Sequence, residues 1–157
     1  MPFRRERHAP PRWHLMLHDT PAPCRYLRTY RIHGCTVLEF HGEIDLAAAI
    51  EITPQLDVAT APPEPLVAID LTPVTFLDCS GLNLLCRAHR RITARYGNLQ
   101  LVCSHPPALR LLRAARLTDT FRPVSALDEA LDRLHPQAGG AAARGTARCQ
   151  QAGDNSG

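Results

Sequence analysis

Two neighbouring stretches decide the fold: Leu-Val-Ala-Ile-Asp-Leu at residues 66–71 and Asp-Cys-Ser-Gly-Leu-Asn-Leu-Leu at residues 78–85. The first is almost continuously apolar, which is typical of a central parallel strand buried on both faces. The second begins a helix predicted from about Ser80 to Arg95, because apolar residues recur there at spacings of three and four. The apolar face of this helix consists of Leu82, Leu85, Cys86, His89 and Ile92. A buried strand followed by an amphipathic helix indicates an α/β domain.

Two further strands and a helix are predicted before the central strand. Cys35–Phe40 is β-branched and apolar, and the weaker strand Tyr26–Ile32 is separated from it by only two residues. Strands joined by so short a turn must be antiparallel. Asp45 is predicted to be the N-cap of a helix, and Pro54 is expected to kink, shorten or interrupt that helix.

The part of the chain after the long helix alternates between strands and helices. Gly97-Asn98 has the chemistry of a C-cap. We then predict a strand at Leu99–Cys103, a short helix at Pro107–Ala115, a short strand at Phe121–Val124 and a last helix capped by Ser125. The order is strand-strand-helix-strand-helix-strand-helix-strand-helix. This order predicts a mixed, mostly parallel sheet of four to five strands flanked by about four helices.

The two ends of the chain differ in composition from the part between them. Residues 1–25 are rich in Arg, Pro and His, and residues 136–157 are rich in Gly and Ala. Neither segment carries enough apolar side chains to offset the entropy of an ordered chain. We therefore expect a flexible N-terminal tail at 1–25, one domain at 26–135 and a disordered C-terminal tail at 136–157.

Charge and cysteine content exclude several classes of function. The net charge is +3, but residues 26–135 carry 11 Arg against 12 acidic residues, so the expected domain is close to neutral. A nucleic-acid-binding domain normally carries an excess of positive charge, so direct binding of nucleic acid is not expected. No stretch approaches the roughly 20 apolar residues of a membrane span. The six cysteines form no CxxC framework and follow no secretory segment, so we expect reduced thiols in a cytoplasmic protein.

Four segments, in order and in spacing, resemble STAS domains, and in particular the bacterial anti-sigma-factor antagonists. They are Gly-Glu-Ile-Asp at 42–45, the strand and loop at 66–77, Asp-Cys-Ser-Gly-Leu at 78–82, and Arg-Leu-Thr-Asp-Thr-Phe at 116–121. Arg116 stands where the family carries Gly. The resemblance covers about 100 residues, the whole of the expected domain, and implies the STAS-like fold.

The resemblance also implies a phosphorylation switch. In this family an anti-sigma factor that is also a serine kinase binds the unmodified antagonist and phosphorylates the hydroxyl after the Asp of the motif. Phosphorylation releases the antagonist, and a metal-dependent serine phosphatase resets it. The resemblance makes Asp45, Asp78, Cys79, Ser80 and Gly81 the expected docking residues, with no cofactor or metal and no catalytic residues.

The switch position departs from the family pattern, because Cys79 occupies the place of the usual acceptor serine. Ser80 follows at once and is the candidate for phosphorylation. A hydroxyl in the first turn of a helix lies beside unpaired N–H groups and the positive end of the helix dipole. Either Ser80 is the acceptor, or the protein binds its partner without phosphorylation control.

Three other hypotheses remain to be compared with this one. A STAS module could bind another partner or a small ligand within a stress-signalling complex. Cys79, at a helix N-terminus, could be a nucleophile or a redox sensor, although the neighbouring Asp78 disfavours its thiolate. Zinc binding is a further reading, but its four candidate ligands lack the paired spacing of a zinc site, so packing is expected for them. These ligands are Cys86, His89, Cys103 and His105.

Overall fold

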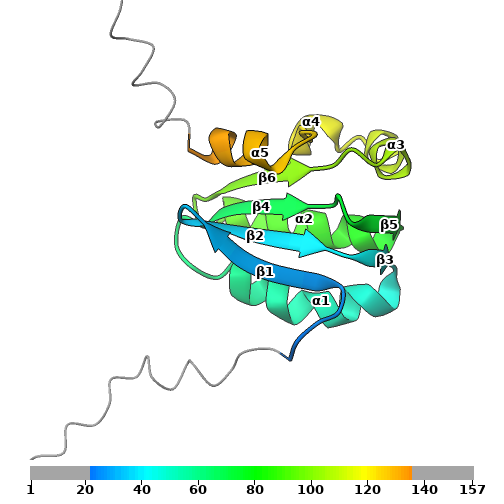
Figure 1. The fold of residues 1–157 in the computed structure, drawn as a ribbon, viewed down its shortest axis with the longest axis horizontal. Helices are drawn as coiled ribbons and strands as arrows, with labels where there is room; N and C mark the ends of the chain where they lie inside the picture. The colour runs from blue at the N-terminus through cyan, green and yellow to red at the C-terminus, as the bar shows by residue number, and fades with distance from the viewer. Residues whose placement is uncertain (1–21, 136–157) are drawn as a thin grey trace, which may run out of the picture.

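A four-stranded sheet in the order β1-β2-β4-β6 forms the centre of the computed structural model, which describes residues 22–135 (Figure 1). The strands are β1 (Leu27–Ile32), β2 (Cys35–Phe40), β4 (Leu66–Asp70) and β6 (Asn98–Val102). β1 pairs antiparallel with β2, whereas β2–β4 and β4–β6 are parallel. The predicted hairpin and the mostly parallel sheet are confirmed.

A second, two-stranded parallel sheet joins β3 (Gly42–Ile44) to β5 (Val74–Leu77). Neither segment was predicted to be a strand from the sequence. Strands of three and four residues are too short to show the alternation by which a strand is recognised. Their pairing places the residue after β3 beside the residue after β5, which matters for the site described below.

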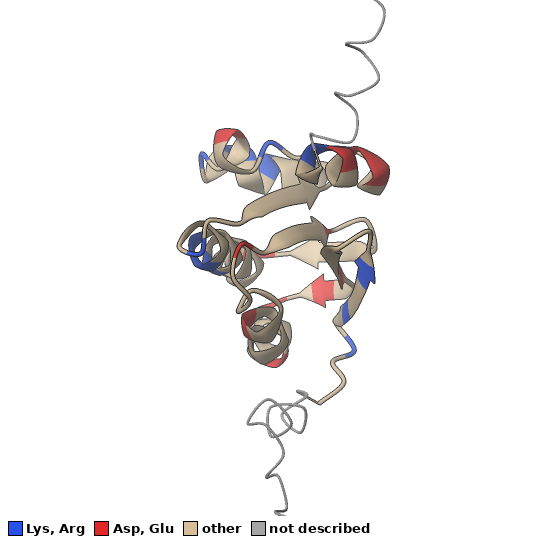
Figure 2. Ribbon diagram, turned by 90° about the vertical axis from the view of Figure 1, so that its left-hand side faces the viewer, with Lys and Arg blue, Asp and Glu red and all other residues tan. Residues whose placement is uncertain are grey.

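The helices cover the two faces of the sheet unequally. α1 (Leu46–Ala59) and α2 (Cys79–Thr93) pack side by side on one face, and α5 (Leu127–Leu134) packs on the other (Figures 1 and 2). α3 (Pro106–Ala114) and α4 (Thr118–Phe121) follow β6. Because side chains alternate between the faces of a strand, the buried residues form two clusters, a larger one under α1 and α2 and a smaller one under α5.

α1 continues through Pro54, so the expectation that this proline would interrupt or shorten the helix is wrong. A proline inside a helix removes one N–H and leaves the carbonyl four residues earlier without its helical donor. That carbonyl belongs to Ile50, whose side chain is exposed, as is Pro54 itself. Water can hydrate a carbonyl on the outer side of a helix, which is why the helix tolerates this proline.

The end of α2 differs in one respect from the C-cap predicted at Gly97. Tyr96, with φ of 58°, adopts the left-handed conformation, and Gly97 does not. Gly97 serves a different purpose, because a Cβ atom at this position would lie 2.3 Å from the carbonyl oxygen of Pro65. A glycine is therefore required here by the close approach of two backbones.

The predicted strand at Phe121–Val124 and the Ser125 cap are both wrong. Residues 118–121 form the short helix α4, and only Val124 makes a parallel bridge, to Val102. Phe121 and Val124 are both buried at a spacing of three, which a turn satisfies and an extended strand does not. The N-cap of α5 is Ala126, without a side-chain hydrogen bond.

Within residues 22–135, no helix has the length and apolar character needed to cross a membrane. The two predicted tails lie outside the described residues, except for 22–25. In that short segment, the carbonyl of Ala22 accepts a hydrogen bond from the Gln55 side chain at 2.6 Å.

Candidate functional site

Two helix N-termini lie side by side at one edge of the molecule. Ile44 and Leu77 are paired in the β3–β5 register, so the next residues, Asp45 and Asp78, are neighbours. The Asp78 N–H donates to the Ile44 carbonyl at 3.4 Å, which ties the two turns together. The structure thus brings together segments that are 33 residues apart in the sequence, the Gly-Glu-Ile-Asp and Asp-Cys-Ser-Gly motifs.

Both aspartates are N-caps, as predicted for Asp45. The Asp45 carboxylate accepts from the Ala48 N–H at 2.9 Å. The Asp78 carboxylate accepts from the N–H groups of Ser80 at 2.7 Å and Gly81 at 3.3 Å. A cap of this kind stabilises a helix by about 1 kcal/mol. Asp78 therefore already occupies two of the first-turn donors that could otherwise hold a phosphate.

Cys79 and Ser80 differ in where they lie. Cys79 is exposed at the first position of α2 and does not line the cavity beside it, whereas Ser80 is half-buried and does. The position that the resemblance predicts for the acceptor, that of Cys79, is thus the exposed one. The hydroxyl at the next position faces α1.

Gly81 shapes the turn from within. It is buried, and a Cβ atom there would lie 2.2 Å from Leu77 Cδ1 and 3.2 Å from Ile44 Cγ2. The absence of a side chain lets the first turn of α2 rest directly on β3 and β5. Gly81 thus positions the predicted docking residues and offers no side chain of its own to a partner.

A groove of about 330 Å³ runs between α1 and α2, along α1 from Leu46 to Thr53 and along α2 from Ser80 to Arg90. We call it the α1–α2 groove, and its lining includes Leu46, Ala49 and Ile50 from α1 and Ser80, Leu84 and Arg90 from α2. It opens beside the two capped turns. The groove could not be predicted from the sequence, because helical periodicity does not show which exposed residues of two helices face each other.

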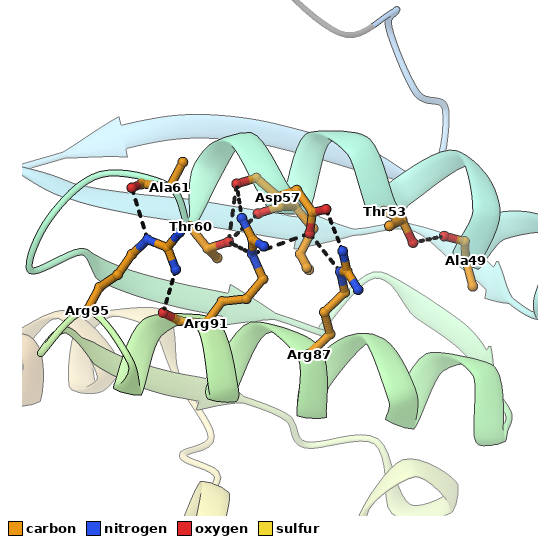
Figure 3. A network of polar contacts seen from close by, with 9 residues as sticks. Ala49, Thr53, Asp57, Thr60, Ala61, Arg87, Arg91 and Arg95 are labelled. Atoms are coloured by element: carbon orange, nitrogen blue, oxygen red, sulfur yellow. Dashed lines mark hydrogen bonds and ion pairs between the residues drawn. The ribbon is translucent and has the colours of Figure 1, made fainter.

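Three arginines in the C-terminal half of α2 and directly after it, which we call the arginine clamp, bind the C-terminal end of α1 and the residues that follow it (Figure 3). They are Arg87, Arg91 and Arg95. Arg87 forms a bidentate pair with Asp57, Nε to Oδ1 at 2.7 Å and Nη2 to Oδ2 at 2.6 Å. This planar, charge-assisted geometry is the strongest form of ion pair in proteins.

The other two arginines of the clamp bind the end of α1. Arg91 donates from Nε to the buried Thr60 hydroxyl at 2.8 Å and from Nη2 to the Asp57 carbonyl at 3.0 Å. Arg95 donates to the Ala61 carbonyl at 3.1 Å. Cations beside the last carbonyls of a helix also interact favourably with its dipole. These arginines therefore bind α1 and the residues after it, and do not form a free, solvated face.

The clamp lowers the pKa of the Asp57 carboxyl, first through the hydrogen bond from Arg87 and further through the positive charges of Arg91 and Arg87, against the opposing effect of partial burial. A folded-state pKa below the unfolded one means that ionised Asp57 stabilises the fold above the ordinary carboxyl pKa, about 4. That contribution is lost as the pH falls through the lowered pKa.

We expect Asp57→Asn to lower the denaturant midpoint near neutral pH, because an amide cannot accept both arms of the Arg87 fork. The difference from wild type should shrink as the pH falls from about 4 to about 2. Urea titrations across this range measure it, with Asp132→Asn on the exposed face of α5 as the control. A difference that stays constant down to the lowest pH would contradict the assignment.

The candidate zinc ligands are not gathered into one site. Among residues 22–135, no group of three or more His, Cys, Asp or Glu side chains is placed to hold a metal ion. His89 packs edge-on against Phe121 at 5.6 Å between ring centres. Burial raises the pKa of the Cys103 thiol. Both side chains thus have packing roles.

A comparison with known protein families gives the class of protein to which this fold belongs. The model of the STAS domain family matches residues 26–130, and the chain belongs to that family. No match is found among curated proteins.

Solved structures show the same fold. An anti-sigma factor antagonist from Mycobacterium paratuberculosis is 27% identical, with a TM-score of 0.65 over 69% of this chain and 92% of that one. An anti-sigma-factor antagonist (STAS) domain protein from Planctomyces limnophilus is 24% identical, with a TM-score of 0.64 over 69% and 97% of the two chains. The Bacillus cell fate determinant SpoIIAA in its phosphorylated form is 20% identical, with a TM-score of 0.55 over 68% and 97%. The last two likenesses concern the fold alone.

Proposed function

We propose that this protein is a cytoplasmic anti-sigma-factor antagonist, which binds an anti-sigma factor of the serine-kinase type and so regulates sigma-factor-dependent transcription. The observation that carries the proposal is the pair of capped helix N-termini. Asp45 and Asp78 lie side by side there, and Cys79, at the first position of α2, is exposed to solvent. The likeness to the Mycobacterium antagonist supports it. The function is one of binding, with Asp45, Asp78, Cys79 and Ser80 at the docking surface and Gly81 beneath it.

We further propose that phosphorylation control is lost at Cys79. A thiol is not an ordinary acceptor for a serine kinase, and the only hydroxyl in the turn, that of Ser80, is half-buried against α1. A phosphate at this turn would add nearly two negative charges beside Asp78, whose carboxylate already takes the Ser80 and Gly81 N–H groups. Such repulsion on a docking surface costs several kcal/mol in a family member that keeps the switch.

The test uses the full chain and purified serine-kinase anti-sigma factors encoded in the same genome. We expect one of them to bind the wild-type protein. With ATP, wild type and Ser80→Ala should take up little phosphate, whereas Cys79→Ser should be phosphorylated, because it restores a hydroxyl at the exposed position. Phosphate content by intact-mass spectrometry is the measurement.

Two results would contradict parts of this proposal. If wild type is phosphorylated and Ser80→Ala is not, the switch is retained at Ser80, and a serine phosphatase then belongs among the partners. If no anti-sigma factor of this type binds the wild-type protein, the antagonist function itself is wrong.

A further inference from the structure

The arginine clamp and the α1–α2 groove follow one another along α1 and overlap at Arg87 on α2. Both helices begin at the β3–β5 edge and run in the same direction, so that successive contacts advance along both (Figure 3). The clamp residues bind Asp57 in the last turn of α1, its C-cap Thr60, and Ala61 directly after the cap. The α1–α2 groove lies beside the first part of α1, from Leu46 to Thr53, and extends along α2 from Ser80 to Arg90.

The α1 wall of this groove exposes large aliphatic side chains. Leu46 and Ile50 are 65% and 67% exposed, although they are four residues apart on one face of the helix. The apolar residues on the sheet side of the same helix, Ile52 and Leu56, are fully buried. Adjacent exposed aliphatic residues that line a concavity indicate a site where a partner buries apolar surface.

The α2 wall adds a cation that the fold does not use. Arg87 and Arg90 both line the groove, but Arg87 is held by Asp57. Arg90 is exposed, and among residues 22–135 no carboxylate lies within salt-bridge distance of it. α1 carries the acidic residues of this helix pair and α2 the basic ones, as Figure 2 shows. The groove therefore combines an apolar wall with a single available positive charge.

We propose that the α1–α2 groove receives an apolar side chain of the anti-sigma factor, and that Arg90 binds a carboxylate beside that side chain. The inference rests on the proposed function and specifies the chemistry of the partner. It follows from the continuity of the groove with Ser80 and the capped turns, and from the charge of Arg90. The occupant is thus an apolar segment of the partner with an acidic residue next to it.

Charge argues against the two other occupants at hand. Residues 1–21 carry Arg4, Arg5, Arg7 and Arg12 against only Glu6 and Asp19, so this segment has the same sign as Arg90. A second copy docked symmetrically would bring a second Arg90 into the same interface. Like charges brought together on a surface disfavour both arrangements.

The test measures affinity for the anti-sigma factor that binds wild type, by isothermal titration calorimetry with the full chain. We expect Ile50→Glu and Arg90→Glu each to weaken binding at least about tenfold, because one places a carboxylate in the apolar wall and the other repels the partner's carboxylate. The matched controls are Val58→Glu, which alters a 55% exposed residue of α1 outside the groove, and Arg110→Glu on the exposed face of α3. Each control should stay within about twofold of wild type.

The outcomes separate the groove from the general function. If wild type binds and Ile50→Glu binds equally well, the groove proposal is wrong while the antagonist function stands. If wild type binds no anti-sigma factor, both fall. If sedimentation shows a wild-type dimer that Ile50→Glu dissociates, the occupant is a second copy and the proposal is overturned. Removal of residues 1–21 could instead strengthen binding of the anti-sigma factor, with no effect of Ile50→Glu on that binding in the shortened chain. In that case residues 1–21 occupy the groove, and the proposal is likewise overturned.

Discussion

Replacing Leu85 by alanine should lower the free energy of unfolding by about 2–5 kcal/mol. Leu85 is fully buried on α2, within the larger cluster between the two helices and the sheet. Truncation would remove the transfer energy of three carbon atoms and leave a cavity that its neighbours cannot fill. Because α2 presents Cys79 and Ser80, the packing of Leu85 also fixes the candidate site.

The matched control is Leu46→Ala, the same chemical change at a residue that is 65% exposed. It should change stability by no more than about 0.5 kcal/mol. Urea denaturation of both variants measures the difference. Equal losses at the two positions would mean that Leu85 is not at the centre of this core. Leu46→Ala should instead weaken binding of the anti-sigma factor, since Leu46 lines the α1–α2 groove.

The second large effect is expected at Gly97, where alanine should destabilise the fold by about 3 kcal/mol. The new Cβ atom would lie 2.3 Å from the Pro65 carbonyl oxygen and 2.5 Å from Pro65 Cδ. Neither backbone can easily move, because the same carbonyl accepts from the Asn98 N–H at 2.9 Å and Glu64 donates to the Arg95 carbonyl at 3.0 Å. The contact lies where β4 and β6 begin their pairing.

The sign of this effect is diagnostic. Where a glycine has an ordinary backbone conformation and open space, alanine stabilises a protein by about 0.4–1 kcal/mol through the unfolded state. Thermal unfolding of Gly97→Ala should therefore show a lower midpoint if the close approach is real, and a higher one if it is not. Gly34→Ala gives a comparison, because its only expected cost is the left-handed φ of 83° and no atom lies within 4 Å of the new Cβ. Its loss should be about 1–2 kcal/mol, smaller than at Gly97.

Different parts of the α1–α2 pair are expected to serve stability and binding: the arginine clamp stabilises the pair, and the groove binds the partner. Arg87 lies at the boundary, since it lines the groove and also binds Asp57. An ion pair that is partly exposed, as this one is, contributes little to stability, but a bidentate fork restricts the spacing of the two helices. The clamp thus restricts the spacing of α1 and α2 next to the groove.

The local elements of this protein could be predicted from its sequence. β2 has the predicted bounds, Asp45 is the predicted cap, and the long helix begins within one residue of its predicted start at Ser80. Each of these features depends on residues within a few positions of one another: an apolar run, a side-chain oxygen before a helix, or a periodic face. The identity of the family followed from the same local motifs.

Contacts between distant segments decided the rest. The β3–β5 pair, the clamp between Asp57 and Arg87, and the approach of Gly97 to Pro65 each join residues about thirty positions apart. No periodicity records such a contact, because its energy depends on where the whole fold places the second partner. The sequence by itself determined that a helix begins at Asp78 with a thiol and then a hydroxyl. Only the tertiary structure decided that the thiol faces solvent and the hydroxyl faces α1, since that choice depends on the packing of one helix against the other.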